Sequence, residues 1–276
     1  MPELELIAGG LAFPEGPAFD SSGRLYWTDM EAGRIGVVDP NQPVPATFVH
    51  TGGNPNGCNF DSEGNLYIAE AGLKQVLKAT PEGELSVFAE GCDGEPFTGP
   101  NDVVFDAAGN AYFTDPVGSD ADSPTGRVYF GTPEGRITQV ADGLAFPNGL
   151  TLTPDGKTLI VAETMTYKLL QYDVLPDGTL GPAGEWGRLH EDGVGGDGMA
   201  LAANGNLYVA HYGRGVIAVL DRDGSVIEEL PAGGARPTNV AFGGPGFDEL
   251  YITETETNAI YRMKLGEPGE PLFPDR

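Results

Sequence analysis

Six residues with a side-chain oxygen recur at intervals of 41 to 49 residues along this chain of 276 residues. Each is the third residue of a turn rich in Pro or Gly: Glu15, Asn56, Asn101, Asn148, Asp197 and Thr238. Carboxylate and amide oxygens, with no Cys or His among them, are the ligands that a hard cation such as Ca²⁺ prefers. The alternative is that these side chains only make hydrogen bonds within their own turns, as Asn, Asp and Thr commonly do.

The sequence around these residues is kept while the residue itself changes. "GLAFPEG" at 10–16 and "GLAFPNG" at 143–149 differ only in having Glu15 where the second stretch has Asn148. In the six segments a short apolar run is followed by a turn such as "SSG", "SEG" or "PDG" and then by a second apolar run such as "LYWTD". Gly adopts the left-handed conformation of such turns, and the preceding polar residue bonds to the backbone. Each segment therefore predicts a β-hairpin.

The repeat length is that of a four-stranded propeller blade. Further apolar runs predict a third and a fourth strand, such as "RIGVVD" and "ATFVHTGG" after the first hairpin. The last repeat lacks a fourth strand, and "LELIAGG" at 4–10 has the pattern of one, so the N-terminal strand is expected to complete the last blade and close the ring. The sequence thus predicts an all-β, six-bladed β-propeller forming a single domain over residues 1–276. A β-sandwich is the rival fold, but it would not require six equivalent units.

In a propeller the first strand of every blade lines the central axis, so the six oxygen-bearing residues would converge on one point. Two carboxylates would neutralise a divalent cation, and the amides would add neutral oxygen ligands. We therefore expect a Ca²⁺ site on the axis, which Zn²⁺, Mn²⁺ or Fe²⁺ could also fill.

The charge and composition of the chain limit the classes of molecule that it is expected to bind. The net charge of −26 argues against nucleic acid and against an anionic membrane surface. No run of 18 apolar residues exists and the N-terminal sequence lacks the pattern of a signal peptide, so a cytoplasmic protein acting on a small molecule is expected. A monomer or a small homo-oligomer is expected. Cys58 and Cys92 show no metal or redox spacing and are expected to be reduced and partly buried.

A second set of equivalent residues ends the second strands: Asp29, Glu70, Asp115, Glu163, His211 and Glu254. We expect these to lie near the mouth of the channel. For the five acids, hydrogen bonding to the adjacent turn is the favoured interpretation, whereas His211 could also contact substrate or transfer a proton. His50 and His190 fall in predicted outer fourth strands and are expected at the surface.

The order Glu, Asn, Asn, Asp in "FPEGP", "GPNDVVFD", "FPNGLTLTPDG" and "GGDGMAL", together with "NAYFTDP" and "GRVYF", resembles the SMP-30/gluconolactonase/luciferin-regenerating-enzyme family over nearly the whole chain. The resemblance implies a six-bladed propeller with an axial divalent metal, usually calcium. It implies hydrolysis, most often of sugar lactones, with diisopropyl-fluorophosphatase-like phosphotriesterases as relatives. Carried over by position, Glu15, Asn101, Asn148 and Asp197 match the metal ligands, and Asp197 matches the catalytic acid/base.

Three positions depart from that family. Vertebrate-type sugar lactonases carry an Arg where this chain has Gly99 and a Glu where it has Ser119. The phosphotriesterase relatives carry a His in the sixth-blade turn, where this chain reads "RPTNV". Neither substrate assignment transfers cleanly to this chain.

The expected function is metal-dependent lactone hydrolysis, in which the cation polarises the carbonyl and Asp197 assists the attacking water. The expected substrate contacts are Asn56, Asn101, His211 and Thr238. The alternatives are a diisopropyl-fluorophosphatase-like phosphotriesterase, a non-catalytic binding propeller with a structural Ca²⁺, and a metal-free strictosidine-synthase-like propeller. The chain lacks the G-x-S-x-G, HExxH and P-loop motifs of serine hydrolases, zincins and nucleotide-binding proteins.

Overall fold

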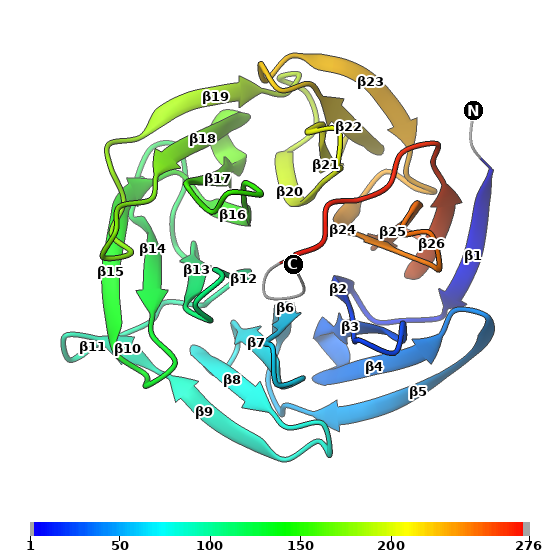
Figure 1. Cartoon of the computed structure of the whole chain (residues 1–276), viewed down its shortest axis with the longest axis horizontal. Helices are drawn as coiled ribbons and strands as arrows, with labels where there is room; N and C mark the ends of the chain where they lie inside the picture. Colours follow the sequence, from blue (N-terminus) through cyan, green and yellow to red (C-terminus); the bar gives the residue numbers. More distant parts are fainter. Residues whose placement is uncertain (1–2, 273–276) are drawn as a thin grey trace.

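The computed structural model describes residues 3–272 and contains six four-stranded antiparallel sheets arranged around one axis (Figure 1). Blade 1 consists of β2 (Pro14–Phe19), β3 (Leu25–Asp29), β4 (Arg34–Asp39) and β5 (Gln42–His50). Blade 2 consists of β6 (Pro55–Phe60), β7 (Leu66–Glu70), β8 (Gln75–Ala79) and β9 (Leu85–Ala89). Blade 3 consists of β12 (Val103–Phe105), β13 (Ala111–Asp115), β14 (Gly126–Gly131) and β15 (Ile137–Leu144). Blade 4 consists of β16 (Pro147–Leu152), β17 (Thr158–Glu163), β18 (Lys168–Asp173) and β19 (Gly184–Arg188). Blade 5 consists of β20 (Gly195–Leu201), β21 (Leu207–Tyr212), β22 (Val216–Leu220) and β23 (Val226–Pro231).

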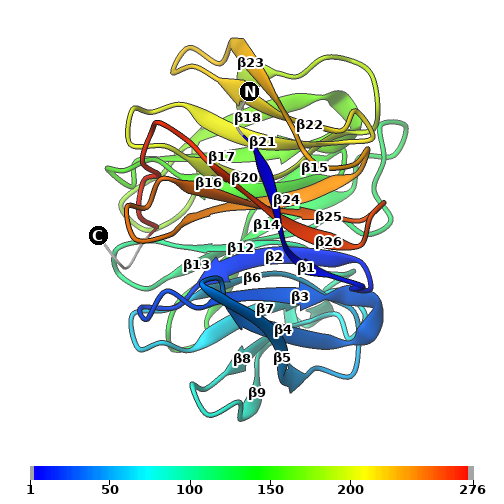
Figure 2. The same ribbon diagram turned by 90° about the vertical axis from the view of Figure 1, so that its right-hand side faces the viewer.

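Blade 6 joins the two ends of the chain. It contains β24 (Pro237–Gly243), β25 (Glu249–Glu254), β26 (Ala259–Lys264) and the N-terminal strand β1 (Leu4–Gly9), which pairs antiparallel with β26. Figure 2 shows this closing strand on the outside of the ring, alongside β26. The predicted six-bladed propeller and its closure by the N-terminal strand are confirmed.

The predicted hairpin turns form through the expected side chains. In blade 1 the carboxylate of Asp20 accepts the N–H groups of Ser22 and Arg24, each at 3.0 Å. Gly23 completes this turn with φ of 81°, a left-handed conformation that other residues adopt at a cost. The turn residues of the repeat therefore determine where each first strand ends and each second strand begins.

The core lies between blades rather than within one. Hydrophobic clusters occupy the spaces between neighbouring sheets, so the second strands are buried on both faces. Aromatic rings join adjacent blades edge to face, as in Tyr26–Phe60 with centroids 5.0 Å apart and Tyr67–Phe105 at 4.9 Å. This packing holds the six inner strands at fixed positions around the axis.

We define two faces of the ring. The entry face carries the loops that lead into the inner strands, and the turn face carries the turns between first and second strands. After β26 the chain crosses the turn face toward the axis, where Gly269 N–H donates to Phe247 O at 2.7 Å and Glu270 N–H to Leu201 O at 2.8 Å (Figure 1). The repeat pattern did not predict this crossing segment, which comprises residues 265–272.

Three short elements were also not predicted. They are the hairpin of β10 (Gly91–Cys92) with β11 (Glu95–Pro96) and the 3₁₀ turns η1 (Met30–Ala32) and η2 (Thr164–Thr166). Within residues 3–272, no helix has the length and apolar character needed to span a bilayer.

Candidate metal centre

The inner strands β2, β6, β12, β16, β20 and β24 follow one another around the axis (Figure 1). The six residues predicted from the repeat lie at or just before their beginnings, on the side of the entry face, and all are at least 90% buried: Glu15, Asn56, Asn101, Asn148, Asp197 and Thr238. Glu15 and Asp197 are close enough to interact electrostatically, and the Asn148 side chain hydrogen-bonds to Asp197. Asp197 therefore lies near two of the other predicted ligands, Glu15 and Asn148.

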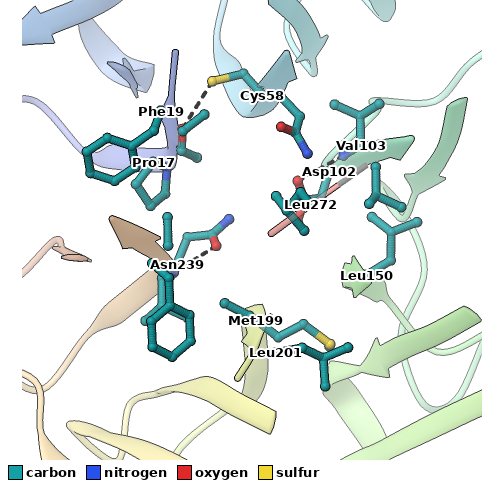
Figure 3. Close-up of a pocket in the computed structure, with 18 of the residues that line it drawn as sticks. Pro17, Phe19, Cys58, Asp102, Val103, Leu150, Met199, Leu201, Asn239 and Leu272 are labelled. Atoms are coloured by element: carbon teal, nitrogen blue, oxygen red, sulfur yellow. Dashed lines mark hydrogen bonds between the residues drawn. The ribbon is translucent and has the colours of Figure 1, made fainter. Parts of the chain in front are cut away.

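Two residues that the repeat analysis missed complete this group. Asp102 and Asn239 directly follow Asn101 and Thr238, and both side chains face the channel interior (Figure 3). The signal was present in the sequence, because the other four blades have Gly at this fourth position. An acid and an amide that interrupt an otherwise invariant Gly pattern mark a place where a side chain is needed.

Asn239 links two of the acids. Its carbonyl Oδ1 accepts the Val240 N–H at 2.8 Å, which leaves the amide NH₂ free to donate. The Asn239 side chain hydrogen-bonds to both Glu15 and Asp102, and in each case this bond lowers the pKa of the carboxyl. The amide of blade 6 thus connects an acid of blade 1 with an acid of blade 3.

Glycines make room for these side chains. A Cβ at Gly57 would stand 2.2 Å from Asp102 Oδ1, and one at Gly198 would stand 1.9 Å from Asn239 Cγ. Contacts this short do not occur between non-bonded atoms, so any larger residue at these positions would displace the polar side chain. The packing around the axis therefore requires glycine at positions 57 and 198.

The acids lie in an environment that disfavours their charge. Burial, with a smaller effect from the charge of Asp102, raises the pKa of Glu15 to about 8, although the hydrogen bonds from Gly16 and Asn239 lower it. Burial also raises the pKa of Asp102 to about 7. For Asp197, burial and the neighbouring charges of Glu15 and Asp102 raise the pKa well above its usual value. The charged groups that act on these three carboxyls are all acids.

Buried carboxylates without a basic partner require either protons or a cation. The donor set fits a hard divalent cation, because it offers carboxylate and amide oxygens and neither sulfur nor imidazole. Within residues 3–272, no three His, Cys, Asp or Glu side chains are grouped closely enough to hold a metal by themselves. A cation here would therefore depend on the amide oxygens of Asn101 and Asn148 as well as on Glu15 and Asp197.

On the turn-face side of these residues the channel contains a cavity of about 120 Å³. Cys58, Leu150 and Met199 line it together with Asp102 and Asn239, and Leu272 of the crossing segment lies beside it (Figure 3). Cys58 Sγ donates to Gly16 O at 3.1 Å, and burial raises the pKa of this thiol. Both cysteines are unpaired, as expected, and both are buried.

The five acids of the second set form hydrogen bonds to the backbone. Each accepts an N–H from a loop on the entry face: Asp29 from Ala12, Glu70 from Leu73, Asp115 from Gly99, Glu163 from Ala145 and Glu254 from Arg236. All five are buried. The favoured interpretation, hydrogen bonding to the adjacent loops, is confirmed.

His211 and Thr238, two of the predicted substrate contacts, are both fully buried. His211 is completely buried on the second strand of blade 5, opposite Gly196, and burial lowers the pKa of its imidazole. The Thr238 hydroxyl, also fully buried, donates to Pro14 O at 2.8 Å and so joins blade 6 to blade 1. His50 and His190 are exposed, as predicted.

Comparison with known proteins agrees with this architecture. The family model described as the SMP-30/Gluconolactonase/LRE-like region matches residues 13–256. The chain is 33% identical to a lactonase drp35 of Staphylococcus saprophyticus, covering 99% of this chain and 89% of that protein. It is 30% identical to the diisopropyl-fluorophosphatase of Loligo vulgaris, covering 94% of this chain and 91% of that protein. A gluconolactonase structure from Xanthomonas campestris shares the fold with a TM-score of 0.84 at 24% identity, over 96% of this chain and 90% of that one.

Proposed function

The chain belongs to the SMP-30/gluconolactonase/LRE-like family, and we propose that it is a divalent-cation-dependent lactone hydrolase. The observation that carries this proposal is the group of two buried carboxyls, Glu15 and Asp197, and the half-buried carboxyl of Asp102, which, within residues 3–272, are under the charge of one another and of no basic side chain. A propeller that served only as a scaffold would gain nothing from gathering three mutually repelling acids at its axis. Fold by itself would not decide the function.

Glu15, Asn101, Asn148 and Asp197 would hold the cation, and Ca²⁺ suits these oxygen ligands best. When bound, the cation supplies Lewis-acid polarisation of the lactone carbonyl and stabilises the charge that develops on its oxygen. The amides of Asn56 and Asn101 lie on the same ring and could donate hydrogen bonds to a substrate oxygen.

Asp197 is the general base in this proposal. Its carboxyl accepts the proton of the attacking water, and the proton then passes to the ring oxygen as the C–O bond of the lactone breaks. Burial and the charges of Glu15 and Asp102 raise the pKa of Asp197 in the metal-free protein, whereas a bound cation would favour its ionised form, which accepts the proton. The product is a hydroxy acid.

A second candidate is phosphotriester or fluorophosphate hydrolysis. It is favoured by the 30% identity to diisopropyl-fluorophosphatase over 94% of the chain. Asp197 would then act either through water or as the nucleophile at phosphorus. The same cation ligands would serve both reactions.

The test is pH-stat hydrolysis of a lactone panel and a fluorophosphate, first with chelator and then after Ca²⁺ is restored. Lactone turnover that disappears with chelator and returns with Ca²⁺ is the expected result. Turnover of the fluorophosphate alone would select the second candidate. Chelator-resistant turnover, with no metal detected by elemental analysis, would contradict the metal centre.

A further inference from the structure

Six residues occupy equivalent positions on the entry face, each two positions before one of the six oxygen-bearing residues of the axis. They are Phe13, Asn54, Gly99, Phe146, Gly195 and Arg236. Because they precede or begin the inner strands, they surround the mouth of the axial site, and we call them the rim. Blades 1 and 4 stand opposite each other in the ring, so Phe13 and Phe146 occupy opposite sides of the rim (Figure 1).

Both rim phenylalanines differ from the other phenylalanines of the protein. Ten of the twelve in residues 3–272 belong to the hydrophobic clusters between the blades, and the two that do not are Phe13 and Phe146. Their side chains are partly exposed. The core therefore does not account for either ring.

Their backbone conformation is also unfavourable. Phe13 has φ of 61° and Phe146 has φ of 63°, in the left-handed region that bulky residues avoid. Residues held in such conformations persist where the surrounding structure imposes them, and they concentrate at functional sites. Gly or Asn would fit these positions with less strain.

The remaining rim positions of blades 3 and 5 offer no polar side chain. A Cβ at Gly99 would stand 2.5 Å from Val117 Cγ2, and Val117 is itself 47% exposed. Gly195 has φ of 141° and a Cβ there would stand 2.1 Å from Thr164 O, so it too must remain Gly. Both positions are closely surrounded by other atoms of the chain, and neither carries a side chain that could hydrogen-bond to a substrate.

The nearby hydroxyl of Ser119 is already engaged. It donates to Leu144 O at 2.5 Å and accepts the N–H groups of Thr125 at 3.0 Å and Phe146 at 3.3 Å. Ser119 is buried, and its bonds hold the loop that carries Phe146. It supports the rim and is not free to bind a substrate hydroxyl.

We propose that Phe13 and Phe146 flank the substrate and select lactones that carry an apolar substituent over polyhydroxylated sugar lactones. This inference rests on the proposed lactonase function and specifies its substrate class. An alkyl or aryl group lying between the rings would be removed from water, which is favourable. Sugar hydroxyls at the same place would lose hydrogen bonds to water, and the rim residues of blades 1, 3, 4 and 5 have no polar side chain to replace them.

Three δ-lactones with the same six-membered ring test the inference: δ-valerolactone without a substituent, δ-decalactone with a pentyl chain, and glucono-δ-lactone with hydroxyl groups. With Ca²⁺ present, kcat/KM for δ-decalactone should exceed that for δ-valerolactone by about tenfold or more, as partial burial of a pentyl chain would give. Glucono-δ-lactone should be the poorest substrate after its spontaneous hydrolysis is subtracted.

The matched variants are Phe13→Asn and Phe146→Asn, since the chain already carries Asn54 at the equivalent position of blade 2. We expect the ratio of kcat/KM for δ-decalactone over δ-valerolactone to fall about tenfold, mainly through KM, while the melting temperature does not fall, because Asn tolerates positive φ better than Phe. Ile227→Asn, at a 54% exposed residue on the outer strand of blade 5, should leave the ratio unchanged.

The outcomes separate the inference from the proposed function. No turnover of any δ-lactone with Ca²⁺ present would overturn the lactonase proposal and the substrate class with it. Turnover with a preference for glucono-δ-lactone, or a ratio unaffected by both Phe→Asn variants, would overturn the apolar rim and leave the lactonase proposal standing.

Discussion

Gly198 of blade 5 lies directly against the side-chain amide of Asn239 on blade 6, so closely that a Cβ at position 198 would be 1.9 Å from Asn239 Cγ. The contact fixes the amide that hydrogen-bonds to Glu15 and Asp102. Because Glu15 is a proposed cation ligand, a packing contact between two blades controls the position of a ligand on a third.

Gly198→Ala should weaken cation binding. The added methyl must push Asn239 away from Glu15 and Asp102, at a cost of about 1–3 kcal/mol for overpacking. We expect the dissociation constant for Ca²⁺, measured by titration calorimetry, to rise about tenfold or more. Gly184→Ala is the matched control, because its Cβ would meet only ordinary contacts at 3.5 Å or more. Equal Ca²⁺ affinity in both variants would contradict the proposed role of Asn239.

Asp197→Asn should abolish turnover without unfolding the protein. The amide is nearly the same size but cannot accept a proton from water, so kcat should fall by about 10²–10⁴-fold. Replacing a buried acid by a neutral group also removes electrostatic repulsion with Glu15, so the melting temperature of the metal-free protein should not fall. The measurements are initial rates on a lactone and thermal unfolding with chelator. Wild-type rates in this variant would exclude Asp197 as the base.

The stability of the metal-free protein should fall as pH rises. Burial raises the pKa of Glu15 to about 8 and that of Asp102 to about 7, above the value of about 4 expected for unfolded carboxyls. The folded protein therefore holds protons more tightly, so this contribution to the free energy of unfolding is fully present below about pH 4 and is lost as pH rises toward about pH 8. Chemical denaturation with chelator at pH 6 and pH 9 measures it.

Added Ca²⁺ should reverse the fall in stability with rising pH. The carboxyls lose their protons as pH rises, and the cation binds more tightly to the ionised groups. Asp102→Asn supplies the comparison, since it removes one of the titrating carboxyls and should flatten the pH dependence of the metal-free protein. A metal-free protein that gains stability between pH 6 and pH 9 would show that these acids are ionised without a cation.

The crossing segment should matter for stability. A Cβ at Gly269 would stand 2.2 Å from Phe242 Cγ, in the cluster between blades 5 and 6. Gly269→Ala should lower the free energy of unfolding by about 1–3 kcal/mol through overpacking. Gly266→Ala is the matched control in the same segment, because nothing lies within 4 Å of its Cβ position. If both variants unfold alike, the segment is not packed as described.

Much of the fold was predictable because its signals are local. Each hairpin needs only an apolar alternation and a turn residue such as Gly23, and six copies of that pattern imply a closed ring. The closing partner of β26 was predictable for the same reason, since "LELIAGG" supplied the missing strand. The axial position of Glu15 and Asp197 then followed from blade symmetry.

Other features of the site depend on contacts between blades, which a sequence repeat does not encode and only the tertiary structure shows. Asp102 and Asn239 act through contacts with other blades, and the fully buried His211 lies on a second strand rather than on the channel wall. The crossing segment has no counterpart in other blades, so no repeat could predict it. A local pattern specifies which residues are equivalent, whereas the packing of one blade against the next determines which of the equivalents face one another, how deeply they are buried and what charge they can carry.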